Sequence, residues 1–130
     1  MYACNGITKS ALSYQEAYNK LFVETNAGSY TSYLRGKRCY TEDDFLREVS
    51  ASFQFPYYFG ENWPAFDECI QDLDWLNFSR IFVLFDDFSQ AFSQQKDIQT
   101  LLQKRVVEYW ERAIEYWALE GKTVEVWLNN

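Results

Sequence analysis

Histidine is absent from this 130-residue chain, and cysteine, proline and glycine are scarce, with three, two and five residues. Without histidine, the chain can form no Ser-His-Asp triad, no Cys-His pair and no histidine-ligated zinc site. Cys4, Cys39 and Cys69 lie far apart and form no CxxC pair, which argues against a metal or dithiol redox site and predicts reduced thiols. No apolar run is long enough for a signal peptide or a membrane span. We therefore expect a soluble cytoplasmic protein that needs no cofactor and does not contact a membrane.

Aromatic residues, in contrast, are abundant, at 20% of the chain: eleven Phe, ten Tyr and five Trp. The length fits one compact domain, and 48% apolar residues are enough for a real core. A core of this size does not need every aromatic residue. Surplus aromatics are typical of contact surfaces.

The net charge of −7 is unevenly distributed along the chain. Residues 1–55 are balanced, with six basic and six acidic side chains, so residues 56–130 carry the whole excess. Such a charge excludes a nucleic-acid binder, because phosphate contacts require basic residues. A solubilising acidic surface would account for scattered acids. Here the acids of residues 61–87 are interleaved with Tyr, Phe and Trp, a mixture that favours a surface for a basic protein partner.

Hydrophobic periodicity predicts an α/β fold with a three-stranded, largely parallel sheet covered by helices. The predicted strands are residues 29–35, 80–85 and 123–128; the predicted helices are residues 10–24 behind Ser10, a helix capped by Thr41 that ends before Pro56, a short helix capped by Asn62, and residues 94–119. The first of these helices precedes the predicted β-α-α-β-α-β unit. Its apolar stripe favours a role in bracing the fold over a role in partner contact.

Residues 55–75, FPYYFGENWPAFDECIQDLDW, combine exposed-looking aromatics with acids at the start of a helix. Pro56 and Gly60 predict a turn, with Gly60 supplying backbone angles that other residues disfavour. Asp67 could serve only to stabilise the positive end of the helix dipole. The coincidence of acids and aromatics equally supports partner contact. The residues alone leave both interpretations open.

This segment resembles the signature of the barstar family of ribonuclease inhibitors, F-P-x-Y-F/Y-G-x-N-W/L-D-A-L-x-D-C-L. The matching residues are Phe55, Pro56, Tyr58, Phe59, Gly60, Glu61, Asn62, Trp63, Ala65, Phe66, Glu68, Cys69 and Ile70. The resemblance continues through Asp72, Asp74 and Trp75 and to the closing Glu120-Gly121 and TVEVWL. It implies a barstar-like domain over residues 29–130, preceded by a helical extension over residues 1–28.

The resemblance further implies that the protein is not an enzyme but an inhibitor, or immunity protein, that blocks the active site of a basic ribonuclease with an acidic helix in place of RNA phosphate. It implies a monomer that forms a one-to-one complex. Glu68 matches the central acid that enters the phosphate site of the nuclease. The full set of expected partner-binding residues is Tyr58, Gly60, Asn62, Trp63, Asp67, Glu68, Gln71, Asp72, Tyr116 and Glu120.

The sequence departs from the signature at three positions of the expected interface. Pro64 replaces an aspartate, the central acid is Glu68 instead of the usual aspartate, and Tyr116 stands where the family can carry an acid. These changes keep the helix negative but alter its geometry. They favour a different basic nuclease over the family's usual target. They also support the alternative of a barstar-like adaptor that binds another basic protein.

An enzyme that uses paired carboxylates is the third hypothesis, and the sequence argues against it. Adjacent residues on a helix point about 100° apart, so Asp67 and Glu68 form a poor acid/base pair. Asp86 and Asp87 follow a predicted strand, where a turn is the ordinary role of such residues.

Overall fold

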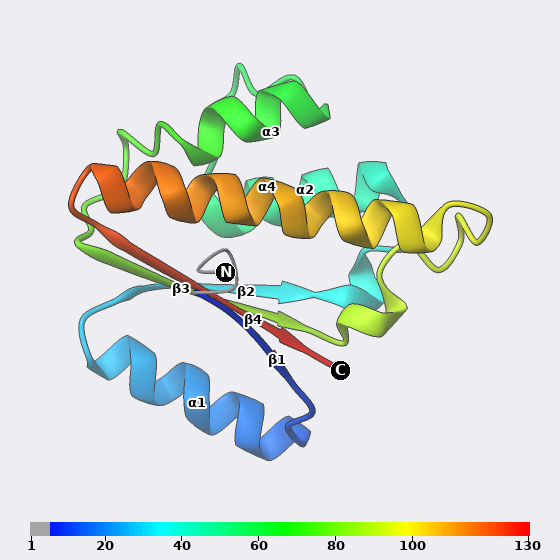
Figure 1. Cartoon of the computed structure of the whole chain (residues 1–130), viewed down its shortest axis with the longest axis horizontal. Helices are drawn as coiled ribbons and strands as arrows, with labels where there is room; N and C mark the ends of the chain where they lie inside the picture. The colour runs from blue at the N-terminus through cyan, green and yellow to red at the C-terminus, as the bar shows by residue number, and fades with distance from the viewer. Residues whose placement is uncertain (1–5) are drawn as a thin grey trace.

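The computed structural model describes residues 6–130, which form a four-stranded, all-parallel sheet. The strands β1 (Ile7–Ser10), β2 (Tyr30–Arg35), β3 (Arg80–Asp86) and β4 (Thr123–Asn129) lie in the order β1-β4-β3-β2 (Figure 1). The predicted α/β class and parallel sheet are confirmed. The predicted count of three strands is corrected to four, because residues 7–10 add an edge strand that pairs with residues 126–129.

The added strand shifts the first helix. Helix α1 spans Tyr14–Asn26, and its N-cap is Ser13, not the predicted Ser10. Ser13 and Glu16 form a reciprocal capping box: the Glu16 N–H donates to Ser13 Oγ at 3.2 Å, and the Ser13 N–H donates to Glu16 Oε1 at 2.9 Å. Ser10 lies at the end of β1, where its Oγ donates to Asn129 Oδ1 at 2.8 Å.

Both faces of the sheet are covered, which explains the continuous apolar sequence of β3. Helices α2 (Glu42–Phe53), α3 (Trp63–Ile70) and α4 (Gln99–Leu119) lie on one side of the sheet, and α1 lies on the other (Figure 1). Ile81, Val83 and Phe85 belong to the larger core beneath the three helices. Phe82 and Leu84 point the opposite way and pack with Ala17 of α1.

Charged side chains hold α1 to the sheet. Glu24 is only 6% exposed and accepts from Arg80 at 2.6 Å and from Lys20 at 3.0 Å. Arg80 also donates to Glu125 of β4 at 2.8 Å. The predicted bracing role of this helix agrees with these contacts. The predicted division at residue 28 stays a prediction, and residues 1–5 of that extension lie outside the described residues.

The helices over the larger core begin where their capping residues stand, with one exception. The side chains of Thr41 and Asn62 accept from the N–H groups of Asp44 and Ala65, at 3.2 and 2.8 Å. Helix α4 begins at Gln99, five residues later than predicted from the sequence. The residues before Gln99 form turns. In these turns Gln95 makes two hydrogen bonds to Glu42, the first residue of α2: Gln95 Oε1 accepts from the Glu42 N–H at 2.6 Å, and Gln95 Nε2 donates to Glu42 Oε2 at 2.9 Å.

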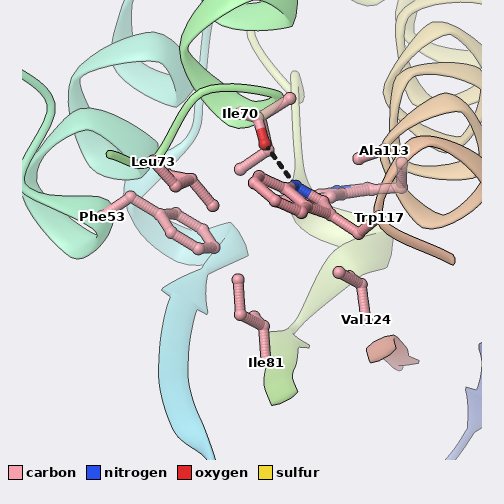
Figure 2. A pocket seen from close by; sticks show the side chains of 8 residues that line it. Phe53, Ile70, Leu73, Ile81, Ala113, Trp117 and Val124 are labelled. Carbon is pink, nitrogen blue, oxygen red and sulfur yellow. Dashed lines mark hydrogen bonds between the residues drawn. The ribbon is translucent and has the colours of Figure 1, made fainter. Parts of the chain in front are cut away.

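Helix α3 is fixed to α4 through the core. Figure 2 shows apolar side chains from α2, α4, β3, β4 and the end of α3 converging around Trp117. Trp117 Nε1 donates to the carbonyl of Ile70 at 2.8 Å. The space enclosed by these side chains is too small to admit a water molecule, so it is packed core and not a ligand site. This contact holds the carboxyl end of α3 against the long helix.

Candidate protein-binding surface

The loop that leads into α3 presents two tyrosines to solvent. The Phe59 N–H donates to the carbonyl of Pro56 at 2.9 Å, and the Phe59 ring packs on Phe55 with 4.9 Å between centroids. This turn directs Phe59 inward and leaves Tyr57 fully exposed and Tyr58 61% exposed. Gly60 was expected to supply backbone angles that other residues disfavour, but it does not have a positive φ; Glu61 takes the left-handed conformation instead, at φ 50°.

Acidic side chains lie beside these tyrosines. Glu68 in the last turn of α3 and Asp72 in the turn that follows the helix are both exposed. The pKa of the Tyr58 phenol is raised, first by partial desolvation and then by the negative charges of Asp72, Glu68 and Asp74. We call Tyr57, Tyr58, Glu68, Asp72 and Asp74 the acidic-aromatic patch.

Within residues 6–130, the acids of this patch have no compensating cation. Glu68, Asp72 and Asp74 form no salt bridge with any basic group of residues 6–130. Acids that do form salt bridges within residues 6–130 include Glu24, Glu42, Asp44, Glu48, Glu61, Asp67 and Glu125. The patch therefore keeps its negative potential, which attracts a positively charged surface.

Asp67 differs from its neighbour Glu68 because it faces α4. Arg112 of α4 donates to Asp67 Oδ2, and Gln71 Nε2 donates to Asp67 Oδ1 at 2.9 Å. The Asp67 side chain is 20% exposed, and its charge is paired within the protein. Asp67 and Gln71 thus join the two helices, while Glu68 and Asp72 face outward.

Three residues of the expected binding loop have a role in the fold. Trp63 is half-buried between the rings of Phe45 and Tyr109, with 5.5 Å between centroids on each side. Its Nε1 donates to Glu42 Oε1 at 2.7 Å, and this hydrogen bond is the main cause of the lowered pKa of Glu42. Asn62 caps α3 and donates from Nδ2 to the carbonyl of Gly60 at 3.2 Å. Gly60 and Asn62 themselves are exposed.

Of the two expected residues at the carboxyl end of α4, Tyr116 lies within the helix and Glu120 directly follows it. Arg112, Tyr116 and Glu120 are spaced by four residues, and Arg112 contacts Asp67. Tyr116 is 36% exposed and meets the Trp117 ring edge to face at 5.0 Å. Glu120 is exposed at the end of the helix. Both residues lie beyond Arg112 along α4, at the margin of the surface formed by α3.

The structure offers little for catalysis. Burial raises the pKa of the Cys39 thiol to about 12, and burial followed by the charges of Glu68 and Asp72 raises that of Cys69. Asp86 is buried and accepts from Tyr33, Asn129 and the Asp87 N–H, at 2.9 to 3.0 Å. These groups are committed to the fold. Among residues 6–130, no cluster of three or more acids or cysteines is suited to hold a metal ion.

Exposed acids without a salt bridge among residues 6–130, lying beside exposed tyrosines on an α/β scaffold, are typical of a protein-binding surface. The model of the family Barstar (barnase inhibitor) matches residues 30–129, so the chain belongs to this family and the predicted barstar-like fold is confirmed. Inhibitors of this family are not enzymes, and the chain is accordingly non-enzymatic. No curated protein matches the chain. Within residues 6–130, none of the helices has the length and apolarity to cross a membrane.

Sequence reasoning left three relevant residues out of the expected site. Tyr57 is the most exposed aromatic residue of the loop, but the family signature specifies nothing at its position. Asp74 belongs to the acidic count of the segment, yet only the fold brings it near Tyr58. Arg112 carries no sequence signal at all, because its partner Asp67 lies 45 residues away.

Proposed function

We propose that the protein inhibits a basic ribonuclease by covering its active site with the acidic-aromatic patch. The acids of α3 and of the turn after it, which form no salt bridge among residues 6–130, carry this proposal, and membership of the Barstar (barnase inhibitor) family supports it. A ribonuclease must present positive charge to RNA phosphates. The exposed carboxylates of Glu68 and Asp72 match that charge, so the patch competes with RNA for the same site.

Within this proposal, Glu68 is the central acid. It is exposed, has no salt bridge within residues 6–130, and projects from the helix next to Tyr58. Tyr58 supplies an amphipathic contact of the kind that is enriched in binding hot spots. Tyr116 and Glu120 contact the partner at the rim. Gly60, Asn62, Trp63, Asp67 and Gln71 hold the loop and α3 in position, and any partner contact of theirs is made by their exposed atoms.

The partner that we propose is a basic nuclease other than barnase itself, such as a toxin encoded beside this protein. Pro64 occupies the first turn of α3, where the signature has an aspartate. One interface carboxylate is therefore missing, while Tyr57 and Asp74 enlarge the patch on its other side. We propose that each chain binds one nuclease, in the cytoplasm, as protection against that enzyme.

RNA cleavage by barnase and by basic nucleases encoded near this protein tests the proposal, with and without added protein. We expect dose-dependent inhibition of one nuclease, weakened at high salt because screening reduces the attraction between exposed charges. The Glu68→Gln variant removes the charge with little change in shape and should relieve inhibition. Leu119→Gln is the matched control, because Leu119 is 87% exposed at the end of α4, outside the acidic-aromatic patch.

Pro64 and Tyr116 support the adaptor as a second candidate, since both replace acids of the family interface. An adaptor would bind a basic protein through the same patch without stopping RNA cleavage. Binding of a nuclease at a surface that leaves cleavage intact would favour this candidate.

A further inference from the structure

Two arginines of α4 lie against α3, beside the acidic-aromatic patch. The guanidinium carbon of Arg105 lies over the Trp63 ring, 5.7 Å from its centroid. Arg112 donates to Asp67, and its guanidinium carbon lies over the Tyr109 ring at 5.2 Å. The Trp63 and Tyr109 rings stack on each other between the two arginines. We call Arg105 and Arg112 the α4 arginines.

Both arginines are more exposed than the acids that they pair with. Arg105 pairs with Glu42 at 3.8 Å, and its side chain is 47% exposed against 29% for Glu42. The Arg112 side chain is 58% exposed against 20% for Asp67. The second oxygen of Asp67 accepts from Gln71. A protein that approaches this surface therefore meets the guanidinium groups before it meets their carboxylates.

The acids of α4 near Arg112 lie on the side of the helix that is turned away from α3. Successive residues of a helix are about 100° apart, so Tyr109, which contacts α3, lies about 60° to one side of Arg112. Three acids lie about 40° to 100° to the other side: Glu108, Glu111 and Glu115. Glu120 lies about 12 Å further along the helix axis. The surface therefore changes sign across α3, from the carboxylates of the acidic-aromatic patch to the guanidinium groups of the α4 arginines.

The chemistry of Arg112 allows it to bind a second carboxylate in addition to Asp67. A guanidinium has five N–H donors in a planar fork that matches the two oxygens of a carboxylate. Arg112 bonds one oxygen of Asp67 through Nη2, while Gln71 bonds the other oxygen. The donors of Arg112 thus exceed what Asp67 accepts, and a guanidinium that lies over an aromatic ring directs its donors to the edge of the stack.

We propose that Arg112 determines which ribonuclease is inhibited, by binding a carboxylate on the surface of the nuclease that faces α4. The inference rests on the proposed function, which brings the cations of the nuclease onto the acidic-aromatic patch. A nuclease with a cation opposite α4 meets Arg112 and is repelled. The chain therefore selects a basic ribonuclease that carries an acidic side chain beside its phosphate-binding cations.

Inhibition constants of two single variants distinguish this contact from a structural role. Arg112→Gln should weaken inhibition about fivefold, because it removes the cation that faces the carboxylate. Asp67→Asn keeps a hydrogen-bond acceptor but removes the competing charge, so it should strengthen inhibition about twofold. Lys104→Gln is the matched control, an exposed cation of the same helix, and should inhibit like the wild type.

The signs of these changes decide the outcome, with thermal unfolding as a check that each variant is folded. Weaker inhibition by both variants would mean that Arg112 and Asp67 only hold α3 to α4. Tighter inhibition by Arg112→Gln would mean that a cation of the nuclease faces α4. Either result overturns the proposal.

An acidic peptide tests the carboxylate site without any nuclease. Hexaglutamate, added to the isotope-labelled full chain at low salt, should shift the Nε–H resonance of Arg112 and leave the Lys104 amide unchanged. No shift at Arg112, or equal shifts at both residues, overturns the inference even where the wild type inhibits a ribonuclease. A wild type that inhibits no ribonuclease but binds the peptide at Arg112 refutes the proposed function and supports the carboxylate site.

Discussion

Replacement of Trp63 separates its role in the fold from a role in binding. Complete removal of a buried tryptophan side chain destabilises a protein by about 3–5 kcal/mol. Because Trp63 is half-buried, we expect Trp63→Ala to lower the free energy of unfolding by about 2–3 kcal/mol, of which ~1 kcal/mol is the hydrogen bond to Glu42. The rest is lost packing against Phe45 and Tyr109.

Urea unfolding followed by circular dichroism measures this change. An equal dependence of the unfolding free energy on urea concentration in variant and wild type checks that both unfold in two states. Tyr57→Ala is the control, since a fully exposed ring should contribute within about 0.5 kcal/mol. Trp63→Phe keeps an aromatic ring between its neighbours and should leave nuclease inhibition intact. If Trp63→Ala destabilised the protein no more than Tyr57→Ala, the packing argument would be refuted.

Two further predictions concern the scaffold. Burial alone would raise the pKa of Glu24, but hydrogen bonds from Lys20 and Arg80 lower it below its ordinary value of 4.5. The stabilising effect of the Glu24 carboxylate is therefore complete above about pH 4.5 and is lost as the pH falls through the lowered pKa. Glu24→Gln should destabilise the protein at pH 7, and in acid unfolding curves the stability of this variant should converge with that of the wild type. Gly36→Ala would place a Cβ 1.9 Å from the Asp87 carbonyl oxygen and should lower the free energy of thermal unfolding by about 3 kcal/mol. In Gly28→Ala the Cβ meets nothing within 4 Å, so only the left-handed backbone is strained and the loss should be about 1 kcal/mol.

Strong local signals explain which elements were predictable. The apolar run of β3 and the caps Thr41 and Asn62 depend on neighbouring residues alone, and the structure confirms these elements. Strand β1 has only four residues, and its pairing partner in β4 lies more than 100 residues away. No local sequence pattern predicts such a strand, because it depends on pairing with a distant segment of the chain.

The candidate site was predictable in composition but not in orientation. The family signature identified α3 and indicated Glu68 as the central acid, yet Asp67 was also expected to bind the partner. Only the packing of α4 on α3 brings Arg112 to Asp67 and leaves Glu68 without a cation among residues 6–130. Likewise, the sequence predicted Trp63 to contact the partner, whereas in the structure Trp63 bonds Glu42 and stacks on Tyr109. Tertiary partners of this kind carry no signal in the local sequence.

The most direct test of the account compares the affinities of Glu68→Ala and Glu120→Ala for the inhibited nuclease at one salt concentration. Loss of a central charged contact should weaken binding by at least ~2 kcal/mol, or about 30-fold. Loss of the rim acid Glu120 should change it by less than about 1 kcal/mol. Isothermal titration or inhibition constants measure both values. Equal effects of the two substitutions, or no effect of either, would contradict the claim that the acids of α3 occupy the phosphate site of the nuclease.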